Sequence, residues 1–360
     1  MIFINFILKE ERNMKIIRQA KQTLSELVRD KRTLKWSPLR TSQWNTHHPF
    51  WVIVHKEISD HVRSWRLTIL AAIIIIACAG SLIAGLMNFR EAVKSADSDD
   101  AFFFLNLFTA SGSGLPSFVV FVSFLGPLLG IGLGFDAINS EQNRGTLGRI
   151  MAQPIYRDHW INAKFTAALL VVSILFFALG FLVLGLGLIK IGIAPTVEEF
   201  LRIMLFILVS IFYVAFWLNL SIFFSVRFRQ AATSALSCIA VWLFLTVFYG
   251  IIVNMIAKVA APSEMATPQE IIRYQEFVIN LLRILPSQLY SDATTTLLTP
   301  SIRSLSPLTS EQIYGTIPSP LPLGQSVMLV WGQLTGLISA TVICFAMAYL
   351  SFMKKEIRSR

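Results

Sequence analysis

One polar segment joins two long apolar runs and carries several charged side chains. Residues 140–160 read SEQNRGTLGRIMAQPIYRDHW, with three arginines and two acids. Glu141 and Arg144 stand three residues apart, a spacing that puts both on one face of a helix. Carboxylate and guanidinium groups at that spacing form ion pairs, so their chemistry suits docking rather than bond making. Gly145 and Gly148 permit turns in the chain, and Pro154 can end a helix.

The same segment also holds a short apolar ridge. In a helix, Leu147, Ile150 and Met151 fall on one face, flanked in sequence by Arg149 and Arg157. A short helix with such a ridge can fit a groove on a soluble partner. The sequence therefore predicts that this segment is a recognition element.

No sequence pattern indicates a catalytic centre. The chain lacks the phosphate-binding pattern G-x-x-x-x-G-K-[ST], the zinc-protease pattern H-E-x-x-H and the hydrolase pattern G-x-S-x-G. Its three cysteines lie inside apolar runs, and its histidines have no Cys or acid cluster at ligand spacing. We therefore expect no catalytic residue, no metal and no cofactor on this chain.

The composition indicates a membrane protein. Hydrophobic residues make up 54% of the 360 residues and charged residues 14%, whereas soluble domains carry about 25% charged residues. A membrane helix needs about 20 mostly apolar residues. Six stretches meet this requirement: Leu67–Phe89, Ser117–Ala137, Phe165–Ile189, Ile203–Val226, Ala231–Ala257 and Ser326–Met353. The predicted fold class is an all-α integral membrane protein with six transmembrane helices.

Positive charge predicts the orientation of these spans. If the N-terminus lies inside, 23 of the 31 Lys and Arg residues fall in inner segments, whereas acids divide almost evenly. Cytoplasmic loops of membrane proteins carry such an excess of cations. We therefore expect a multi-pass protein of the cytoplasmic membrane with both termini in the cytoplasm.

Five further parts complete the predicted organisation. Residues 1–48 form a basic cytoplasmic arm, for which either Met1 or Met14 could be the start, and residues 354–360 a basic tail. Residues 49–66 mix Trp with Lys and Arg, which favours an interfacial elbow helix; a helix continuous with the first span is the alternative. Within the six-span domain 67–353, the inner loop covers 136–164 and the outer loop 258–325. The outer loop holds an amphipathic helix expected to cap the outer face, followed by a proline-rich lead-in to the last span.

The interiors of the spans carry almost no ionisable residue, so neither a proton relay nor an ion-coupling site is visible. Small and uncharged polar residues remain as candidates for bending or for lining a path. Glycine and proline in the second span permit either a bend or close static packing. These candidates are Gly126, Pro127, Gly130, Asn219 and Asn254. If the spans move a substrate, the energy must therefore come from another protein, and it must reach this chain at a cytoplasmic surface.

At this point the sequence resembles a known family. SEQNRGTLGRIMAQPIYRDHWINAK is similar to the signature of ABC-2-type permeases, the membrane subunits of ABC exporters. The signature has an acid, Gly-Thr-Leu, a Pro-Ile pair, a basic residue and a lysine before the next span. The matching residues are Glu141, Gly145, Thr146, Leu147, Pro154, Ile155, Arg157 and Lys164. The long outer loop loosely resembles that of a subgroup that includes permeases for copper-enzyme maturation.

The resemblance implies a division of labour between subunits. The loop after the second span would dock on a separate ATP-binding subunit, which holds ATP and Mg²⁺, and two permease copies would share the transporter. The second and fifth spans would border the path, and an ion pair of Glu141 with a cation would hold the coupling element. The implied coupling residues are Glu141, Arg144, Gly145, Thr146, Leu147, Pro154, Ile155 and Arg157. Partners are thus the ATP-binding subunit, a second permease and the lipid bilayer, with no nucleic acid.

Two other classes remain open. A membrane-embedded enzyme or an energy-independent channel would need ionisable or nucleophilic groups within the spans. A structural anchor would use the basic arm to bind anionic lipid or another protein. Copurification with an ATPase that responds to changes at Glu141 or Gly145 separates the exporter from these alternatives.

Overall fold

The computed structural model describes residues 49–95, 102–109, 116–152, 155–192, 194–263, 266–305 and 320–355, together with Gln22. By its contacts, the chain divides into residues 1–48 and a unit of residues 49–360. The predicted basic arm therefore lies outside the described residues, except for the exposed Gln22.

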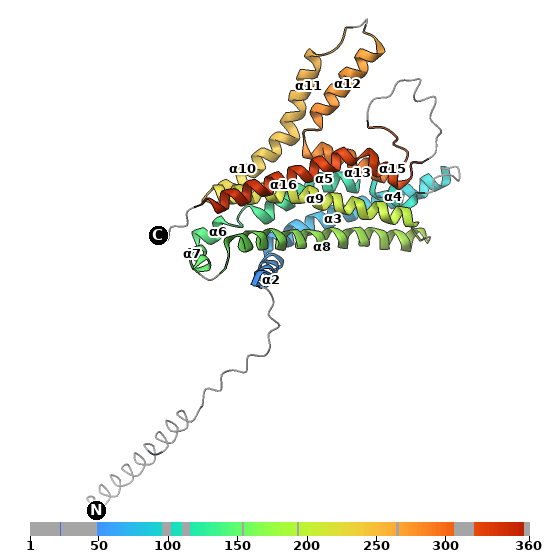
Figure 1. Cartoon of the computed structure of the whole chain (residues 1–360). Helices are drawn as coiled ribbons and strands as arrows, with labels where there is room; N and C mark the ends of the chain where they lie inside the picture. Colours follow the sequence, from blue (N-terminus) through green and yellow to red (C-terminus); the bar gives the residue numbers. More distant parts are fainter. Residues whose placement is uncertain are drawn as a thin grey trace, which may run out of the picture. The chain divides into compact units, whose positions relative to one another are not determined.

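All regular elements of the described residues are helices (Figure 1). They are α2 (Pro49–Val62), α3 (Trp65–Ser95), α4 (Phe103–Thr109), α5 (Phe118–Gly134), α6 (Asn139–Asn143), α7 (Thr146–Met151), α8 (Arg157–Ile191), α9 (Val197–Arg227), α10 (Ala231–Leu243), the π-helix η1 (Phe244–Phe248), α11 (Tyr249–Val259), α12 (Pro268–Leu282), α13 (Pro286–Leu298), α15 (Leu323–Leu329) and α16 (Trp331–Met353). Six of the described helical stretches are long and apolar enough to cross a membrane, which confirms the predicted fold class.

Helix α9 is the centre of the bundle. It packs against α5, α8, α10, α13 and α16. In its most apolar stretch of 18 residues 72% are buried, against 11% in the corresponding stretch of the span formed by α10, η1 and α11. An apolar helix that is buried on nearly all sides needs protein partners around it, whereas the fifth span leaves its surface to the bilayer or to another chain.

Two spans begin earlier than the hydropathy pattern predicts. Helix α8 starts at Arg157 rather than Phe165, because Trp160 and Ile161 are buried and continue the packed face. Helix α9 starts at Val197 rather than Ile203, because Thr196 and Glu199 form a capping box that satisfies free N–H groups. The charged residues that flank these spans therefore do not mark the ends of the helices, and where the bilayer begins along α8 and α9 stays a prediction.

The elbow region forms a separate helix, α2, rather than an extension of the first span. The helix ends at Val62, and α3 begins at Trp65 after Ser64, whose Oγ accepts a hydrogen bond from the N–H of Leu67. Val54 of α2 packs against Ala163 and Ala167 of α8. The alternative of one continuous helix is therefore wrong, while the location of α2 in the headgroup layer stays a prediction.

The outer segment differs from the predicted single capping helix. Helix α12 forms where the amphipathic pattern indicates, but it buries no side chain fully and contacts α11. A second helix, α13, packs along α9: the rings of Tyr290 and Tyr213 stack with centroids 4.4 Å apart, and Tyr290 hydrogen-bonds Ser210. The residues that lie against the bundle thus belong to α13, which the sequence analysis missed. Of the proline-rich lead-in, residues 306–319 lie outside the described residues.

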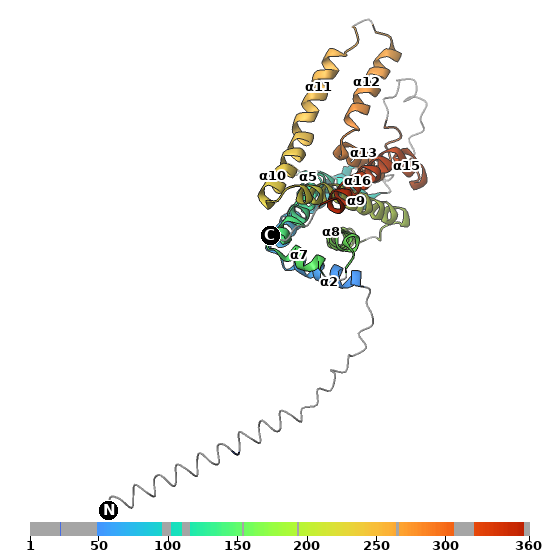
Figure 2. The same cartoon turned by 60° about the vertical axis from the view of Figure 1, so that its left-hand side comes forward.

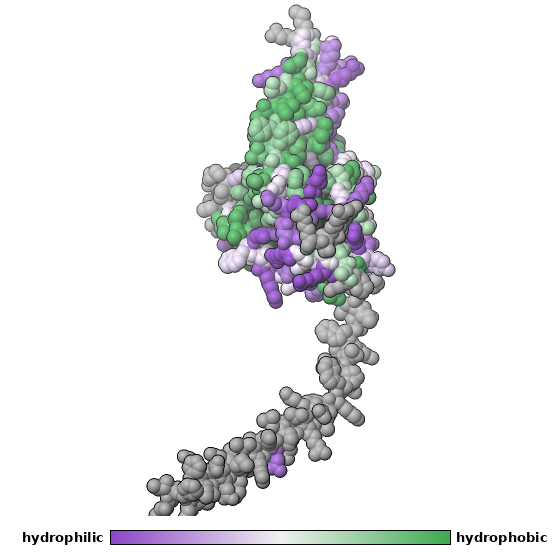
Figure 3. Space-filling model, turned by 90° about the vertical axis from the view of Figure 1, so that its left-hand side faces the viewer, coloured by the Kyte–Doolittle hydropathy of each residue, from purple (hydrophilic) through white to green (hydrophobic). Residues whose placement is uncertain are grey.

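The fifth span departs from the bundle. Figures 1 and 2 show that α10 begins beside the other helices and that α11 and α12 rise away from them as a hairpin. The π-helix η1 interrupts the span between α10 and α11. Figure 3 shows hydrophobic surface over the rising part and hydrophilic residues on the end of the bundle that faces the viewer.

Candidate functional site

The segment between α5 and α8 is an ordered pair of short helices. Helix α6 covers Asn139–Asn143 and α7 covers Thr146–Met151. Between them Gly145 adopts a left-handed conformation with φ of 69°, and a Cβ there would meet nothing within 4 Å. Backbone conformation rather than space therefore explains the glycine, since other residues adopt positive φ at a cost.

The start of α6 is fixed to the end of α9. The N–H groups of Ile138 and Asn139 donate to Ser225 Oγ over 3.0 and 3.3 Å. At the other end of α6, Asn143 Nδ2 donates to the carbonyl oxygen of Arg229, 3.0 Å away. The short helix is therefore held at one end by α9, which accepts the free backbone donors, and at the other by the connection between α9 and α10, which accepts from Asn143.

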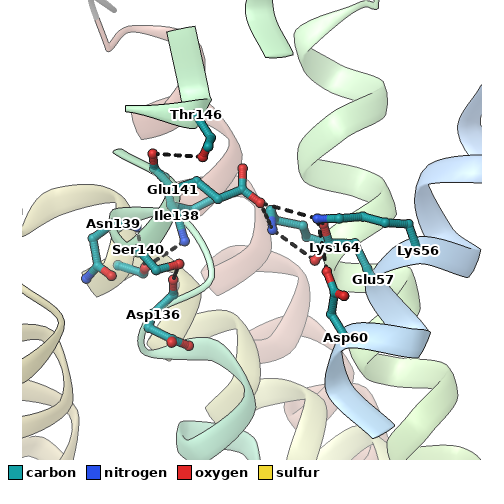
Figure 4. A network of polar contacts seen from close by, with 11 residues as sticks. Lys56, Glu57, Asp60, Asp136, Ile138, Asn139, Ser140, Glu141, Thr146 and Lys164 are labelled. Atoms are coloured by element: carbon teal, nitrogen blue, oxygen red, sulfur yellow. Dashed lines mark hydrogen bonds and ion pairs between the residues drawn. The ribbon is translucent and has the colours of Figure 1, made fainter. Parts of the chain in front are cut away.

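An ion-pair network ties α6 to α8 and α2 (Figure 4). Lys164 Nζ lies 2.9 Å from Glu57 Oε2 and 2.9 Å from Glu141 Oε1. The side chains of Lys164, Glu57 and Glu141 are 5%, 7% and 13% exposed, so this is a buried cluster. Lys56 adds a partly exposed cation 3.7 Å from Glu141 and 2.9 Å from Glu57. Glu141 thus has the cationic partner that the family resemblance implies.

Electrostatics favour the charged forms of this cluster. Burial alone would raise the pKa of Glu57, but Lys164 and Lys56 together lower it below its ordinary value. Burial likewise opposes the charge of Lys56, yet Glu57 and Asp60 hold its pKa above the usual range. Glu141 Oε2 is buried and has no hydrogen-bond partner among the described residues. That oxygen is a free acceptor at the joint between α6 and α8.

A charged cavity of about 510 Å³ lies next to the cluster and is lined by residues of α2, α3, α5, α6 and α8. Asp136, just after α5, forms an ion pair with Arg66, whose guanidinium also lies over the ring of Phe135, 4.9 Å from its centroid. Arg63 and Arg144 line the cavity as well. The elbow helix and the α6 region therefore face each other across polar, charged walls.

The C-terminal end of α16 reaches the same region. Lys355 Nζ donates to Gln142 Oε1 over 2.9 Å and to the carbonyl oxygen of Val226 over 2.6 Å. Arg157 at the start of α8 donates to the carbonyl oxygen of Lys355, 3.4 Å away. Burial and the nearby Arg229 and Arg227 lower the pKa of Lys355. A displacement of α6 is thus opposed at contacts with α2, α8, the α9–α10 connection and the end of α16.

The predicted apolar ridge of α7 faces the interior of the chain instead of a partner. Leu147 is 3% exposed, and Ile150 and Met151 pack against the main hydrophobic core of the chain itself. The uncovered side of α6 and α7 instead presents Arg144 and Arg149. The ridge prediction is therefore wrong because a six-residue helix buries its apolar face on its own protein when that core is available.

The remaining predicted coupling residues are not all in contact. Thr146 Oγ1 donates to the carbonyl oxygen of Glu141, 3.2 Å away, and closes the turn between α6 and α7. Ile155 is half-buried, and Arg157 belongs to α8. Pro154 lies outside the described residues.

The candidates for bending and path lining fall into two groups. Gly126, Pro127 and Gly130 are buried in α5, and a Cβ on Gly130 would lie 2.7 Å from a backbone oxygen of α9. This favours close packing over bending. Asn219 is buried in α9, whereas Asn254 is exposed on α11, so the structure does not bring the two together.

Several residues of the site escaped the sequence analysis. Glu57 and Ser225 were not singled out. Lys164 was identified as the signature lysine before the third span but not as a partner of Glu57 or Glu141, and Lys355 was read as part of a basic tail. Their partners lie 107, 87, 23 and 213 residues away along the chain. A single sequence gives no signal for such pairs, apart from the acid in the amphipathic stretch of α2.

These features define a polytopic helical membrane protein in which ion pairs hold an ordered loop after the second span. The chain belongs to a known family: the model of the ABC-2 family transporter proteins matches residues 51–357. The family resemblance is thereby confirmed, and the protein is the membrane permease component of such a transporter. A comparison with curated proteins gave no match.

Proposed function

We propose that this permease works with a separate ATP-binding subunit and a second permease copy, and exports its substrate across the cytoplasmic membrane. The α6–α7 segment is the coupling element on which the ATP-binding subunit docks. No catalytic residue of ATP hydrolysis belongs to this chain in the proposal, since ATP and Mg²⁺ are held by the partner. The N- and C-termini lie on the same, cytoplasmic, side.

The attachment of α6–α7 carries this proposal. The segment is tied to α2, α8, the α9–α10 connection and the end of α16 by buried ion pairs and hydrogen bonds. A push on α6 is therefore transmitted to several spans at once, whereas a passive connector needs no such ties. Its uncovered side presents Arg144 and Arg149, two cations available to acids of a soluble partner.

The exposed apolar surface of the fifth span supports the proposal of a second permease copy. Leu236, Ile251 and Met255 are 67%, 53% and 64% exposed on α10 and α11, and they form part of an apolar surface that the single chain leaves uncovered. ATP-driven closure of the partner subunits would favour one arrangement of the spans over another, provided the two arrangements dock with different free energy.

Substitutions at two glycines test whether the α6–α7 segment is the coupling element. Gly145→Val forces a branched side chain into a left-handed conformation, which costs about 1–2 kcal/mol and distorts the turn between α6 and α7. Gly148→Ala is the control, because Gly148 is helical and a Cβ there meets nothing within 4 Å. The permease is coexpressed with an ATP-binding subunit that copurifies with it, and the ATPase activity of the purified complex is measured.

We expect Gly145→Val to reduce that activity severalfold while membrane insertion is retained, and Gly148→Ala to leave it near the unaltered level. Unchanged activity in Gly145→Val would mean that the segment is a spacer. Uphill transport by the purified chain alone in liposomes would refute the dependence on a partner, because the energy would then have to come from another source.

A further inference from the structure

A second cavity, separate from the charged one, lies between α8, α9 and α16. Its volume is about 330 Å³, within the range of small-molecule sites. The walls are mainly aromatic and aliphatic, with Phe165, Phe177, Phe212 and Phe345 among them. Such a lining favours a hydrocarbon chain over a polar ligand.

One strongly polar residue interrupts this apolar lining. Asn219 lines the cavity and is 1% exposed. Its Nδ2 donates to the carbonyl oxygen of Thr341, 3.3 Å away, while its Oδ1 has no hydrogen-bond partner in the described part of the chain. Turning the amide over would set two acceptors against each other, so the oxygen is the end that lacks a partner.

The other polar groups of the lining do not supply the missing donor. Ser173 Oγ donates to the carbonyl oxygen of Leu169 over 2.8 Å, and Thr341 Oγ1 donates to that of Leu337 over 2.8 Å. Each hydroxyl has one proton, which is already used. The donor for Asn219 must therefore come from a molecule in the cavity.

The depth of Asn219 makes an unpaired oxygen costly. It lies eight residues from the end of α9 at Arg227, which is about 12 Å along the helix axis. The hydrocarbon core of a bilayer is about 30 Å thick, so Asn219 belongs to its interior, where water is scarce. An acceptor buried there without a donor destabilises the protein, and a ligand that donates removes this cost.

The cavity opens toward the surface of the bundle. Leu208, Phe212 and Val342 line it and are 42%, 41% and 58% exposed. These side chains form a rim on a surface that faces lipid in a membrane protein of this class. A ligand dissolved in the bilayer can therefore enter without crossing water.

We propose that this cavity binds an amphiphile with an alkyl chain and one hydroxyl group, which donates a hydrogen bond to Asn219 Oδ1. The alkyl chain fills the aromatic lining, and the hydroxyl group satisfies the single unpaired acceptor. The proposal depends neither on the ATP-binding partner nor on the direction of transport.

Competition between matched ligands tests the proposal. The full chain in lipid nanodiscs is photolabelled with decanol that carries a diazirine on its alkyl chain. Unlabelled decanol and decyl methyl ether then compete; they have similar chains, but the ether cannot donate a hydrogen bond. We expect labels on α8, α9 or α16, and about tenfold stronger competition by decanol, since a bond to an otherwise unpaired buried acceptor is of that order.

Two variants separate the hydrogen bond from general partition into lipid. Asn219→Leu removes the acceptor and should abolish the preference for decanol over the ether. Asn254→Leu is the same change at an exposed site on α11 and should retain it. If Asn219→Leu fails to fold, Val342→Trp, which fills the rim, should reduce the labelling severalfold.

Equal competition by decanol and the ether in the unaltered chain would overturn the proposal, and it is the result expected if water occupies the cavity. A preference for decanol that persists in Asn219→Leu would overturn it as well. So would labelling confined to helices that do not line the cavity.

Discussion

Lys164 lies near the start of the third span, where a cation would ordinarily reach water. Instead its side chain is 5% exposed and forms ion pairs with both Glu57 and Glu141. Two carboxylates this close to one ammonium group repel each other when the ammonium group is removed. Breaking a buried pair by removing one partner is much more costly than the net contribution of the pair itself.

A substitution at Lys164 should therefore destabilise the protein strongly. Lys164→Met keeps the length of the side chain and its apolar contacts but leaves two buried acids with only the half-exposed Lys56 as a cationic partner. We expect a loss of about 3–5 kcal/mol in the free energy of unfolding, measured by denaturant unfolding of the purified chain in detergent. Adding Glu57→Gln and Glu141→Gln to the same variant should recover part of this loss.

Lys56→Met provides the matched control. Lys56 contacts the same acids, but its side chain is 54% exposed, so solvent screens the interaction. An exposed pair contributes about 0–1 kcal/mol. Equal destabilisation by the two substitutions would show that burial of Lys164 has no particular role in the cluster.

At this scale the sequence could indicate Glu141 but not its partners. Its place in a recognisable segment identified it, whereas Glu57 is distant in the chain and lies on a helix whose position relative to α8 cannot be read from spacing. Lys164 looked like a boundary residue because hydropathy treats every lysine as solvated. The cluster exists because α2 packs on α8, and that packing depends on small residues, Ala163 and Ala167, with no charge signal of their own.

Among the elements, the contact of α5 with α9 depends on glycine. A Cβ on Gly130 would lie 2.7 Å from the carbonyl oxygen of Val214 and 2.9 Å from the backbone nitrogen of Leu218. These are backbone atoms of a helix and cannot move aside as a side chain can. The two helices therefore approach so closely because Gly130 has no side chain.

Gly130→Ala should consequently force α5 away from α9. We expect a loss of about 1–3 kcal/mol in the free energy of unfolding, as for an overpacked core. Gly185→Ala in α8 is the control, since a Cβ there meets nothing within 4 Å, and it should be neutral or slightly stabilising. Unfolding in detergent measures both, and a neutral Gly130→Ala would favour the bending role over close packing.

The elements could be predicted where hydropathy alone determines them. All six spans follow from long apolar runs, because a helix in a bilayer satisfies every backbone group internally. The elements that the sequence analysis missed depend on side-chain packing and on local hydrogen bonds instead. Helix α13 begins with Pro286 and contains Ser and Thr, so its hydropathy is low, and it is recognised through packing of Tyr290 on α9. The early start of α9 depends on hydrogen bonds between Thr196 and Glu199.

At the scale of the whole molecule, the buried charged side chains of the described residues gather at two ends of the bundle. At one end, α2, α6 and the end of α16 meet around Lys164 and Lys355. At the other, Arg202 is fully buried and donates to the carbonyl oxygens of Leu297 and Leu321. The middle is held by apolar packing around α9. In the proposed function, the end near α6 receives the force from the partner, while Arg202 keeps α9, α13 and α15 together at the opposite end.

The orientation of the molecule in the membrane can be tested with single cysteines. The positive-inside rule puts the α6–α7 end in the cytoplasm and the segment after α13 outside. Arg149→Cys and Ser301→Cys each introduce a thiol at an exposed position. The native Cys78, Cys238 and Cys344 are all buried, so the unaltered chain serves as the blank. In intact cells a membrane-impermeant maleimide should label Ser301→Cys at once, and Arg149→Cys after the membrane is permeabilised. The reverse pattern would invert the permease and remove the α6–α7 segment from the reach of any cytoplasmic ATP-binding subunit.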